Sequence, residues 1–134
     1  MNATAIDHVN LSFPADRLDE VLDFYVDTLG FETDFDDPRA AIQADPGLFT
    51  IHLGGDCRLY VNPTDEFESA DGPYRHLALR VDDFPASIER VLRDEGVAIQ
   101  SEATREREEF GEYTSYYVDD PFGYTVELMA VGAK

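Results

Sequence analysis

The chain has 134 residues, 43% of them hydrophobic, and a formal net charge of −19. This length suits one domain or two small fused units, and no apolar run approaches the roughly 18 residues of a membrane-spanning helix. The single cysteine excludes an internal disulfide and a cysteine-rich zinc site, and the acidic balance argues against nucleic-acid binding, which needs a basic surface.

The acidic residues are spread along the chain, and Lys134 is the only lysine beside nine arginines. A carboxylate-covered surface with almost no lysine resembles that of proteins from salt-loving organisms, because a Debye length of about 3 Å at 1 M salt screens self-repulsion. We interpret the charge as an adaptation of this halophilic kind. The first ten residues lack a basic region followed by an apolar stretch, so the predicted location is the cytoplasm.

The first half of the chain predicts strand, helix and three more strands. Residues 6–13 alternate apolar and polar side chains, which is typical of a strand. Apolar residues recur at helical spacing over 18–29, with Asp16 expected as the N-cap and Gly30 just past the helix end. A short strand, a loop and two strands joined by a Gly-Gly-Asp turn are expected over residues 31–36, 37–48, 49–53 and 57–62.

The second half repeats this order after a polar linker over residues 63–73. Its helix begins near Asp83, with Pro85 in the first turn, and ends at Gly96. The charged run 104–112 is expected to be a solvated loop or hairpin edge without a chemical role. The remaining strands are predicted over residues 74–81, 97–102, 116–118 and 124–131.

The chain is therefore predicted to be an internal repeat of α+β class, a single domain over residues 1–134. Two tandem βαβββ modules occupy about 4–62 and 74–131. Aligning the first strands places His8 over His76, a shift of 68 residues, and aligning the last strands places Tyr60 over Glu127, a shift of 67. A period of this length that occurs only twice indicates a fused pair of modules rather than a solenoid.

In each predicted strand, ionisable and polar side chains lie opposite the aliphatic face. If the helices cover the aliphatic faces, these polar faces line a cleft between two sheets. Glu127 stands in mid-strand among apolar residues, where burying a carboxylate costs several kcal/mol unless a partner meets it. The polar faces carry His8, Asn10, Ser12, His52, Arg58, Tyr60, His76, Arg80, Thr125 and Glu127.

Two interpretations of these residues stay open. Two histidines and a carboxylate that leave coordination positions for substrate form a set that suits Fe(II), Mn(II), Zn or Ni. Alternatively, His8 is a hydrogen-bonded structural residue. Glu127 would then pair with Arg80 or Arg58 across the sheet, which requires no metal.

Four stretches of the chain resemble the vicinal oxygen chelate superfamily: IDHVNLSF around His8, FYVDTLGF at the first helix end, YRHLALRVDD around His76, and YYVDDPFGYTVEL around Glu127. This group includes glyoxalases, extradiol dioxygenases, fosfomycin- and bleomycin-resistance proteins and methylmalonyl-CoA epimerases. The resemblance covers nearly the whole chain. It implies paired βαβββ modules that form an open barrel around a divalent metal, with ligands at His8, His76 and Glu127.

The resemblance further implies a glyoxalase-like lyase or isomerase, or an extradiol-type dioxygenase, with Fe, Mn, Ni, Co or Zn. Its substrate would be a small molecule that chelates the metal through two neighbouring oxygens. Lactoylglutathione-lyase-type glyoxalases have a carboxylate at the position of Tyr60, and its absence argues against that activity. His52 and Tyr60, with Tyr117 as a third candidate, are expected to move protons. The alternative is a metal-free binding or resistance protein of the bleomycin-resistance type.

The chain is expected to form a homodimer. A module of about 60 residues is marginal as an independent core and leaves strand edges unpaired. Pairing the modules covers those edges. Relatives pair their modules within one chain or between chains, and the linker 63–73 can span either distance at about 3.3 Å per residue.

Overall fold

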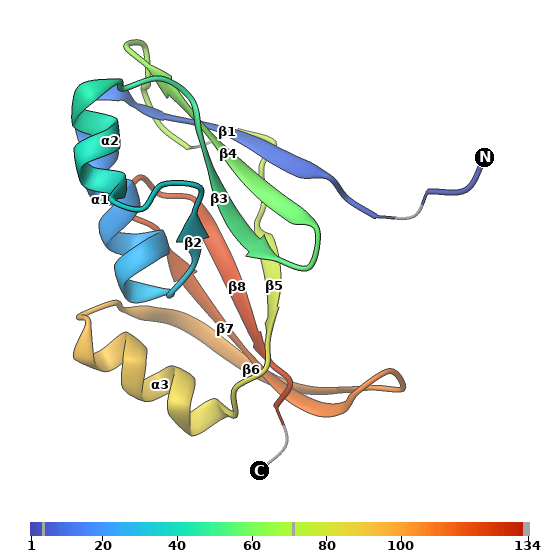
Figure 1. Cartoon of the computed structure of the whole chain (residues 1–134). Helices are drawn as coiled ribbons and strands as arrows, with labels where there is room; N and C mark the ends of the chain where they lie inside the picture. Colours follow the sequence, from blue (N-terminus) through green and yellow to red (C-terminus); the bar gives the residue numbers. More distant parts are fainter. Residues whose placement is uncertain (4, 71, 133–134) are drawn as a thin grey trace. The chain divides into compact units, whose positions relative to one another are not determined.

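The computed structural model describes residues 1–3, 5–70 and 72–132. The chain divides into two compact units, Met1–Glu68 and Ser69–Lys134, and each contains one open four-stranded sheet (Figure 1). The boundary falls within the predicted linker. The predicted α+β class with two βαβββ modules is confirmed. Within the described ranges, no helix combines the length and the apolar character needed to cross a membrane.

The sheet of unit 1 has the strand order β1-β4-β3-β2, with β1 parallel to β4 and the other pairs antiparallel. The first strand begins at His8 rather than at residue 6, and Ile6 is exposed. The fourth strand continues two residues into the predicted linker. The bounds are β1 (His8–Pro14), β2 (Glu32–Thr33), β3 (Phe49–Gly54) and β4 (Cys57–Thr64).

The predicted first helix is three consecutive helical segments: a 3₁₀ turn η1 (Ala15–Arg17), an α-helix α1 (Leu18–Val21) and a π-helix η2 (Leu22–Thr28). Asp16 is not the N-cap, because it lies inside the 3₁₀ turn. Gly30 ends the helical stretch as expected, with φ of +80°. The wider π-helical turn follows from a pattern of hydrogen bonds that apolar periodicity alone does not predict.

A helix, α2 (Pro38–Ala44), occupies the segment that was expected to be a loop, so that prediction is wrong. Asp37 is its N-cap and accepts a hydrogen bond from the backbone N–H of Ala40 at 3.2 Å. Pro38 stands in the first turn, where its missing N–H costs nothing. Only Ile42 of this helix is buried, so the apolar stripe that marks most helices is absent.

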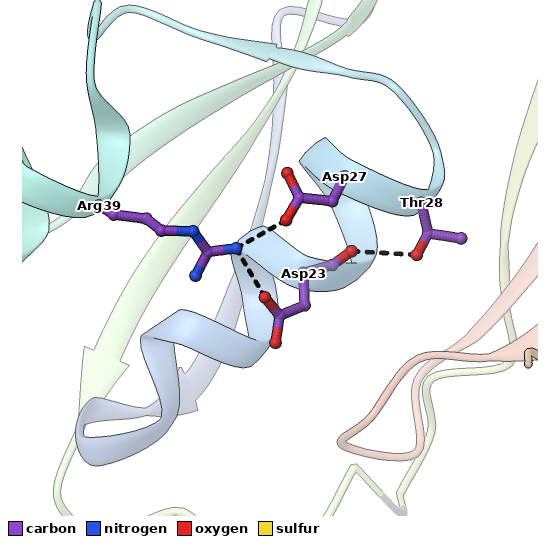
Figure 2. A network of polar contacts seen from close by, with 4 residues as sticks. All are labelled: Asp23, Asp27, Thr28 and Arg39. Atoms are coloured by element: carbon purple, nitrogen blue, oxygen red, sulfur yellow. Dashed lines mark hydrogen bonds and ion pairs between the residues drawn. The ribbon is translucent and has the colours of Figure 1, made fainter. Parts of the chain in front are cut away.

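Ion pairs attach α2 to η2 (Figure 2). One guanidinium nitrogen of Arg39 donates to Asp23 at 2.6 Å and to Asp27 at 2.7 Å. The hydroxyl of Thr28 donates to the backbone carbonyl of Asp23 at 3.0 Å. Because all three charged side chains are substantially exposed, this network is expected to add little to stability at high salt.

Unit 2 has the strand order β5-β8-β7-β6, and its described residues include the helix α3 (Pro85–Asp94). Phe84, not Asp83, is the N-cap position of α3, and Gly96 ends the turn that follows with φ of +72°. The charged run 104–112 belongs to the long hairpin of β6 and β7 (Figure 1). The strands are β5 (Leu77–Val81), β6 (Ile99–Arg107), β7 (Gly111–Asp119) and β8 (Thr125–Ala130).

Helix α3 covers one face of this sheet. Ile88 and Leu92 of the helix are buried, and the hydroxyl of Tyr116 donates to the Glu89 carboxylate at 2.9 Å. Burial, and then this hydrogen bond, raise the pKa of Tyr116. Because successive strand residues point to opposite faces, Tyr117 lies on the face away from α3.

The turn between β7 and β8 is built around a buried carboxylate. Asp120 is 4% exposed, and its Oδ1 accepts backbone N–H bonds from Phe122 and Tyr124, both at 2.9 Å. Gly123 supplies the positive φ of +95° that the turn requires. This turn fixes where β8 begins and therefore where Glu127 stands along it.

Both ends of β8 are also held to the neighbouring strand β5. Before β5, the hydroxyl of Tyr74 donates to the backbone carbonyl of Thr125 at 3.0 Å, and burial raises the pKa of Tyr74 to about 12. After β8, the N–H of Val131 donates to Val81 at 3.1 Å, and that of Gly132 donates to Asp83 at 3.2 Å. These contacts fix the register between the segment that carries His76 and the strand that carries Glu127.

Candidate functional site

His76 and Glu127 form a pair in unit 2. Nε2 of His76 lies 3.1 Å from Oε1 of Glu127, and the His76 side chain is 41% exposed whereas that of Glu127 is 9% exposed. The hydroxyl of Ser115 donates to Oε2 of Glu127 at 2.6 Å. One carboxylate oxygen is therefore bonded within the sheet, and the other is directed at the imidazole.

Strand register explains why these side chains meet. Tyr117 of β7 and Ala78 of β5 are the partners of Glu127 on its two neighbouring strands. Ser115 lies two residues from Tyr117 and therefore on the same face. The ring of Tyr117 meets the ring of His76 edge-on, with centroids 5.7 Å apart. This face, opposite α3, thus carries a carboxylate, an imidazole, a phenol and a hydroxyl together.

Of the two interpretations that the sequence left open, the pairing of Glu127 with Arg80 is not seen in unit 2. The guanidinium of Arg80 lies over the ring of Phe110, 5.0 Å from its centroid. The guanidinium of Arg58 belongs to unit 1 and lies 3.6 Å from the carboxylate of Asp7. The partners of Glu127 are a hydroxyl and an imidazole, and the imidazole is a cation only when it is protonated.

The equivalent pair in unit 1 is His8 and Tyr60. Their rings stack, with centroids 4.1 Å apart and an angle of 13° between the ring planes. Nδ1 of His8 donates to the Asp7 carboxylate at 2.8 Å. This hydrogen bond, and then the charge of Arg58, lower the pKa of Asp7. Since a carboxylate only accepts, Nδ1 carries the proton, and Nε2 is the nitrogen that can bind a metal.

The strand registers show that the two pairs occupy equivalent positions. Tyr60 is partnered with Asn10 across β1 and β4, and Glu127 is partnered with Ala78 across β5 and β8. These residues are related by the shifts of 68 and 67 found in the sequence. Tyr60 therefore stands in unit 1 where Glu127 stands in unit 2.

His52, the second predicted proton carrier, lies farther from His8 than Tyr60 does. Its Nε2 lies 2.6 Å from the Asp34 carboxylate. Arg58 is the strand partner of both His8 and His52, so these histidines are two strands apart, about 10 Å at the usual strand spacing. Tyr60 contacts His8 directly, whereas Arg58 stands between His8 and His52.

The predicted metal ligands include two donors that the structure brings together. In the part of the chain that the structure describes, no group of three or more His, Cys, Asp or Glu side chains is gathered to hold a metal ion. His76 and Glu127 are two of the three predicted ligands, and His8 belongs to the other unit. Ligand atoms about 2.1 Å from one metal ion stand about 3.0–3.4 Å apart. The separation of 3.1 Å between Nε2 and Oε1 therefore suits two ligands of one ion.

Sequence reasoning missed three residues of these two faces. Ser115 shares the alternation of Tyr117, so the strand pattern contained the signal for it. Asp7 directly precedes His8, and adjacent carboxylates commonly orient a ligating histidine. Asp34 follows the two-residue strand β2, and no local pattern places it beside His52.

The sequence matches the model of the Glyoxalase/Bleomycin resistance protein/Dioxygenase superfamily over residues 5–128. Because the match covers most of the 134 residues, the chain belongs to this superfamily. No curated protein matches the sequence.

Solved structures share this fold over nearly their whole length. An integron cassette protein from V. cholerae is 23% identical, with 97% of each chain covered and a TM-score of 0.69. A glyoxalase family protein from Enterococcus faecalis is 23% identical, with 93% of this chain and 96% of that chain covered and a TM-score of 0.62. A glyoxalase/dioxygenase from Nostoc punctiforme is 16% identical, with 99% of each chain covered and a TM-score of 0.69. At these identities the likeness establishes the fold.

Proposed function

We propose that this protein is a divalent-metal-dependent enzyme, a glyoxalase-like lyase or isomerase or an extradiol-type dioxygenase. Its ligands would be His8, His76 and Glu127, and its substrate a small molecule that chelates the metal through two neighbouring oxygens. The observation that supports this most strongly is the His76–Glu127 pair. A buried carboxylate whose one oxygen is held by Ser115 presents its other oxygen beside a half-exposed imidazole.

The desolvation of Glu127 gives the physical reason. Glu127 is 9% exposed, and the partners of its two carboxylate oxygens are a hydroxyl and an imidazole. Neither partner carries a fixed charge, so together they offset only part of the cost of burying a carboxylate. A divalent ion held by Oε1 of Glu127 and Nε2 of His76 would offset the rest, and it would supply Lewis-acid polarisation of the substrate oxygens. Ser115 holds Oε2 and so turns Oε1 towards His76. Asp7 holds Nδ1 of His8 and so presents Nε2.

Proton transfer is assigned first to Tyr60 and second to His52. Tyr60 stacks on His8, a proposed ligand, so its phenol would lie next to a substrate bound there. His52 holds its Nε2 proton on Asp34, so Nδ1 is the basic nitrogen. Replacing Tyr60 with Phe should lower turnover more than replacing His52 with Gln. The opposite order would transfer the main proton-transfer role to His52.

Metal analysis of protein purified without an affinity tag tests the proposal. We expect close to one equivalent of Fe, Mn, Ni, Co or Zn per chain, because three side chains that bind the metal directly should retain it through purification. Less than about a tenth of an equivalent, with no uptake on incubation, would overturn the enzyme proposal. Fe would favour ring-cleaving dioxygenation, and Ni or Zn would favour lyase or isomerase chemistry.

The metal-free alternative is separated by His76→Ala. An enzyme of the proposed kind should lose both metal and turnover when this ligand is removed. A binding or resistance protein of the bleomycin-resistance type should keep its affinity for its ligand, because no metal takes part in its binding. His52→Ala is the matched control for metal content, because its Nε2 is engaged with Asp34.

A homodimer in the cytoplasm is part of the proposal. A chain with His8→Ala mixed with a chain with Glu127→Ala tests how the modules pair. If each site combines His8 of one chain with His76 and Glu127 of another, the mixed dimer regains one intact site. If each site is built within one chain, the mixture stays inactive. Sedimentation at high salt that shows only a monomer of 15.1 kDa would rule out the dimer.

A further inference from the structure

The charged run at the end of β6 is sorted by sign across the two faces of the sheet. Glu102 and Glu106 point to one face, whereas Arg105 and Arg107 alternate with them and point to the other. Ala103, two residues before Arg105, is the strand partner of Ser115. The arginines therefore share the face that carries His76 and Glu127, in a run that sequence reasoning left without a chemical role.

The arginines on this face differ in the groups that their guanidinium contacts. Arg107 lies 2.9 Å from the Glu109 carboxylate and, like Arg80, over the ring of Phe110. Arg105 is exposed, and its NH1 donates to the hydroxyl of Tyr117 at 3.3 Å. In the described ranges no carboxylate lies within 4.0 Å of the Arg105 guanidinium, although the chain has 29 acidic residues.

Tyr117 links Arg105 to the candidate metal ligands. Its ring meets His76 edge-on, and it is the strand partner of Glu127. The phenol oxygen accepts from Arg105, so its own O–H is available to donate. A planar guanidinium and a phenol side by side form a donor set that matches the oxygens of a carboxylate, phosphate or phosphonate.

We propose that Arg105, held by Tyr117 beside His76 and Glu127, binds an anionic oxygen group of the substrate, so that the substrate is a carboxylate, phosphate or phosphonate. This inference rests on the proposed function of the same face. A chain of net charge −19 repels an anion, and a neighbouring buried carboxylate repels it further. An anionic substrate therefore needs a local cation, and Arg105 supplies one where the substrate would also meet the ligands.

Titration of the full chain with inorganic phosphate and with acetate, followed by backbone and arginine side-chain NMR signals at constant low ionic strength, tests the inference. We expect saturable shifts at Arg105 and Tyr117. Arg105→Gln should weaken the binding at least about tenfold, as loss of a charge-assisted hydrogen bond does. Arg105→Lys should weaken the binding less than Arg105→Gln does, because lysine keeps the positive charge but lacks the planar arrangement of guanidinium donors. The ion that binds more tightly identifies the class of anion.

Arg90→Gln is the matched control, because Arg90 is an exposed arginine on α3 whose loss makes the same change in net charge. It should leave anion binding unchanged. Three outcomes would overturn the inference: no saturable binding of either ion, equal binding by Arg105→Gln, or an equal loss in Arg90→Gln. Metal content measured on the same samples separates the two proposals. Anion binding without metal would contradict the proposed function alone, and metal without anion binding would contradict this inference alone.

Discussion

The two units place chemically different pairs at the same position of the same fold. In unit 1, His8 stacks on the neutral ring of Tyr60. In unit 2, His76 faces the carboxylate of Glu127, which Ser115 holds from within the sheet. The shared strand register thus places a histidine at the same position in each unit. The residue paired with it differs, so the pair in unit 1 contains one of the proposed metal ligands and the pair in unit 2 contains two.

The two pairs also differ in how deeply their surroundings are buried. Asp7 and Arg58, the neighbours of His8, form an ion pair with one another, in which Asp7 is exposed and Arg58 is half-buried. Glu127 lies in a strand whose residues from Val126 to Ala130 are all buried. A buried carboxylate destabilises the fold unless well-ordered polar partners bind it, whereas water can hydrogen-bond an exposed imidazole if its protein partner is lost. Unit 2 is therefore expected to be the more sensitive of the two to substitution.

The largest effect on stability is expected from the turn that precedes β8. Asp120→Ala leaves two buried backbone N–H groups without their acceptor and should lower the free energy of unfolding by about 3 kcal/mol. Asp120→Asn keeps an acceptor and should lose less. Asp56→Ala, in the exposed turn between β3 and β4, is the control in unit 1 and should change little. Equal losses in urea unfolding at both aspartates would contradict this account.

A smaller effect is expected where the chain leaves β8. A Cβ at Gly132 would lie 2.7 Å from the carbonyl carbon of Asp83 and 2.9 Å from the carbonyl oxygen of Asp82, and backbone cannot move aside cheaply. Gly132→Ala should therefore cost about 2 kcal/mol. The shift of 67 residues relates Gly132 to Asp65, which is exposed. Asp65→Ala should cost almost nothing, and denaturant midpoints of the two variants measure the difference.

The third prediction concerns alkaline pH. The pKa of Tyr74 is about 12 against an ordinary 10.0, so its neutral phenol stabilises the fold fully below pH 10. That contribution is lost as the pH rises from 10 to 12. Tyr74→Phe should cost about 1 kcal/mol at pH 7, through the lost bond to Thr125. The gap between the two proteins should narrow above pH 10, as thermal unfolding at several pH values would show. A constant gap would contradict the pKa argument.

The smallest effect is expected at the ion pairs between α2 and η2, which have no counterpart in the described residues of unit 2. Arg39→Ala should lower stability by about 0.5 kcal/mol at low salt, because the three charged groups are exposed. The difference from the unmodified chain should vanish near 1 M salt, where screening is strong. Arg90→Ala on α3 is the control. A loss that persists at high salt would indicate that the aliphatic part of Arg39, rather than its charge, holds α2.

The repeat was predictable because it rests on alternation and on helix-ending glycines, which are local signals. The helix α2 was missed because it buries only Ile42, although Asp37 followed by Pro38 was a start signal. The N-cap predicted at Asp16 was wrong, because Pro14 precedes the first helical turn in the folded chain, whereas the second helix does begin near Asp83, with Phe84 at its N-cap position. The residue types near a helix start do not determine which residue is the first of the helix.

For the site, the sequence predicted which residues share one face of a strand. His76 and Glu127 lie together, as their alternation and the repeat indicated. A search for an oppositely charged partner of Glu127 could not find Ser115, because Ser115 is neutral. The register between β7 and β8 brings its hydroxyl to the carboxylate. Arg105 was overlooked for a related reason. Its run looks uniformly charged in the sequence, and only the strand separates the arginines from the glutamates.

The affinity for one divalent ion, measured by equilibrium dialysis on a panel of variants, tests the central claim most directly. The unmodified chain should bind about one ion per chain, and His8→Ala, His76→Ala and Glu127→Gln should each lose at least about a hundredfold in affinity, more than is usual for the loss of an outer-shell partner. His52→Ala should bind like the unmodified chain. Unchanged affinity in His8→Ala, or an equal loss in His52→Ala, would contradict a site made of two equivalent histidines and one glutamate.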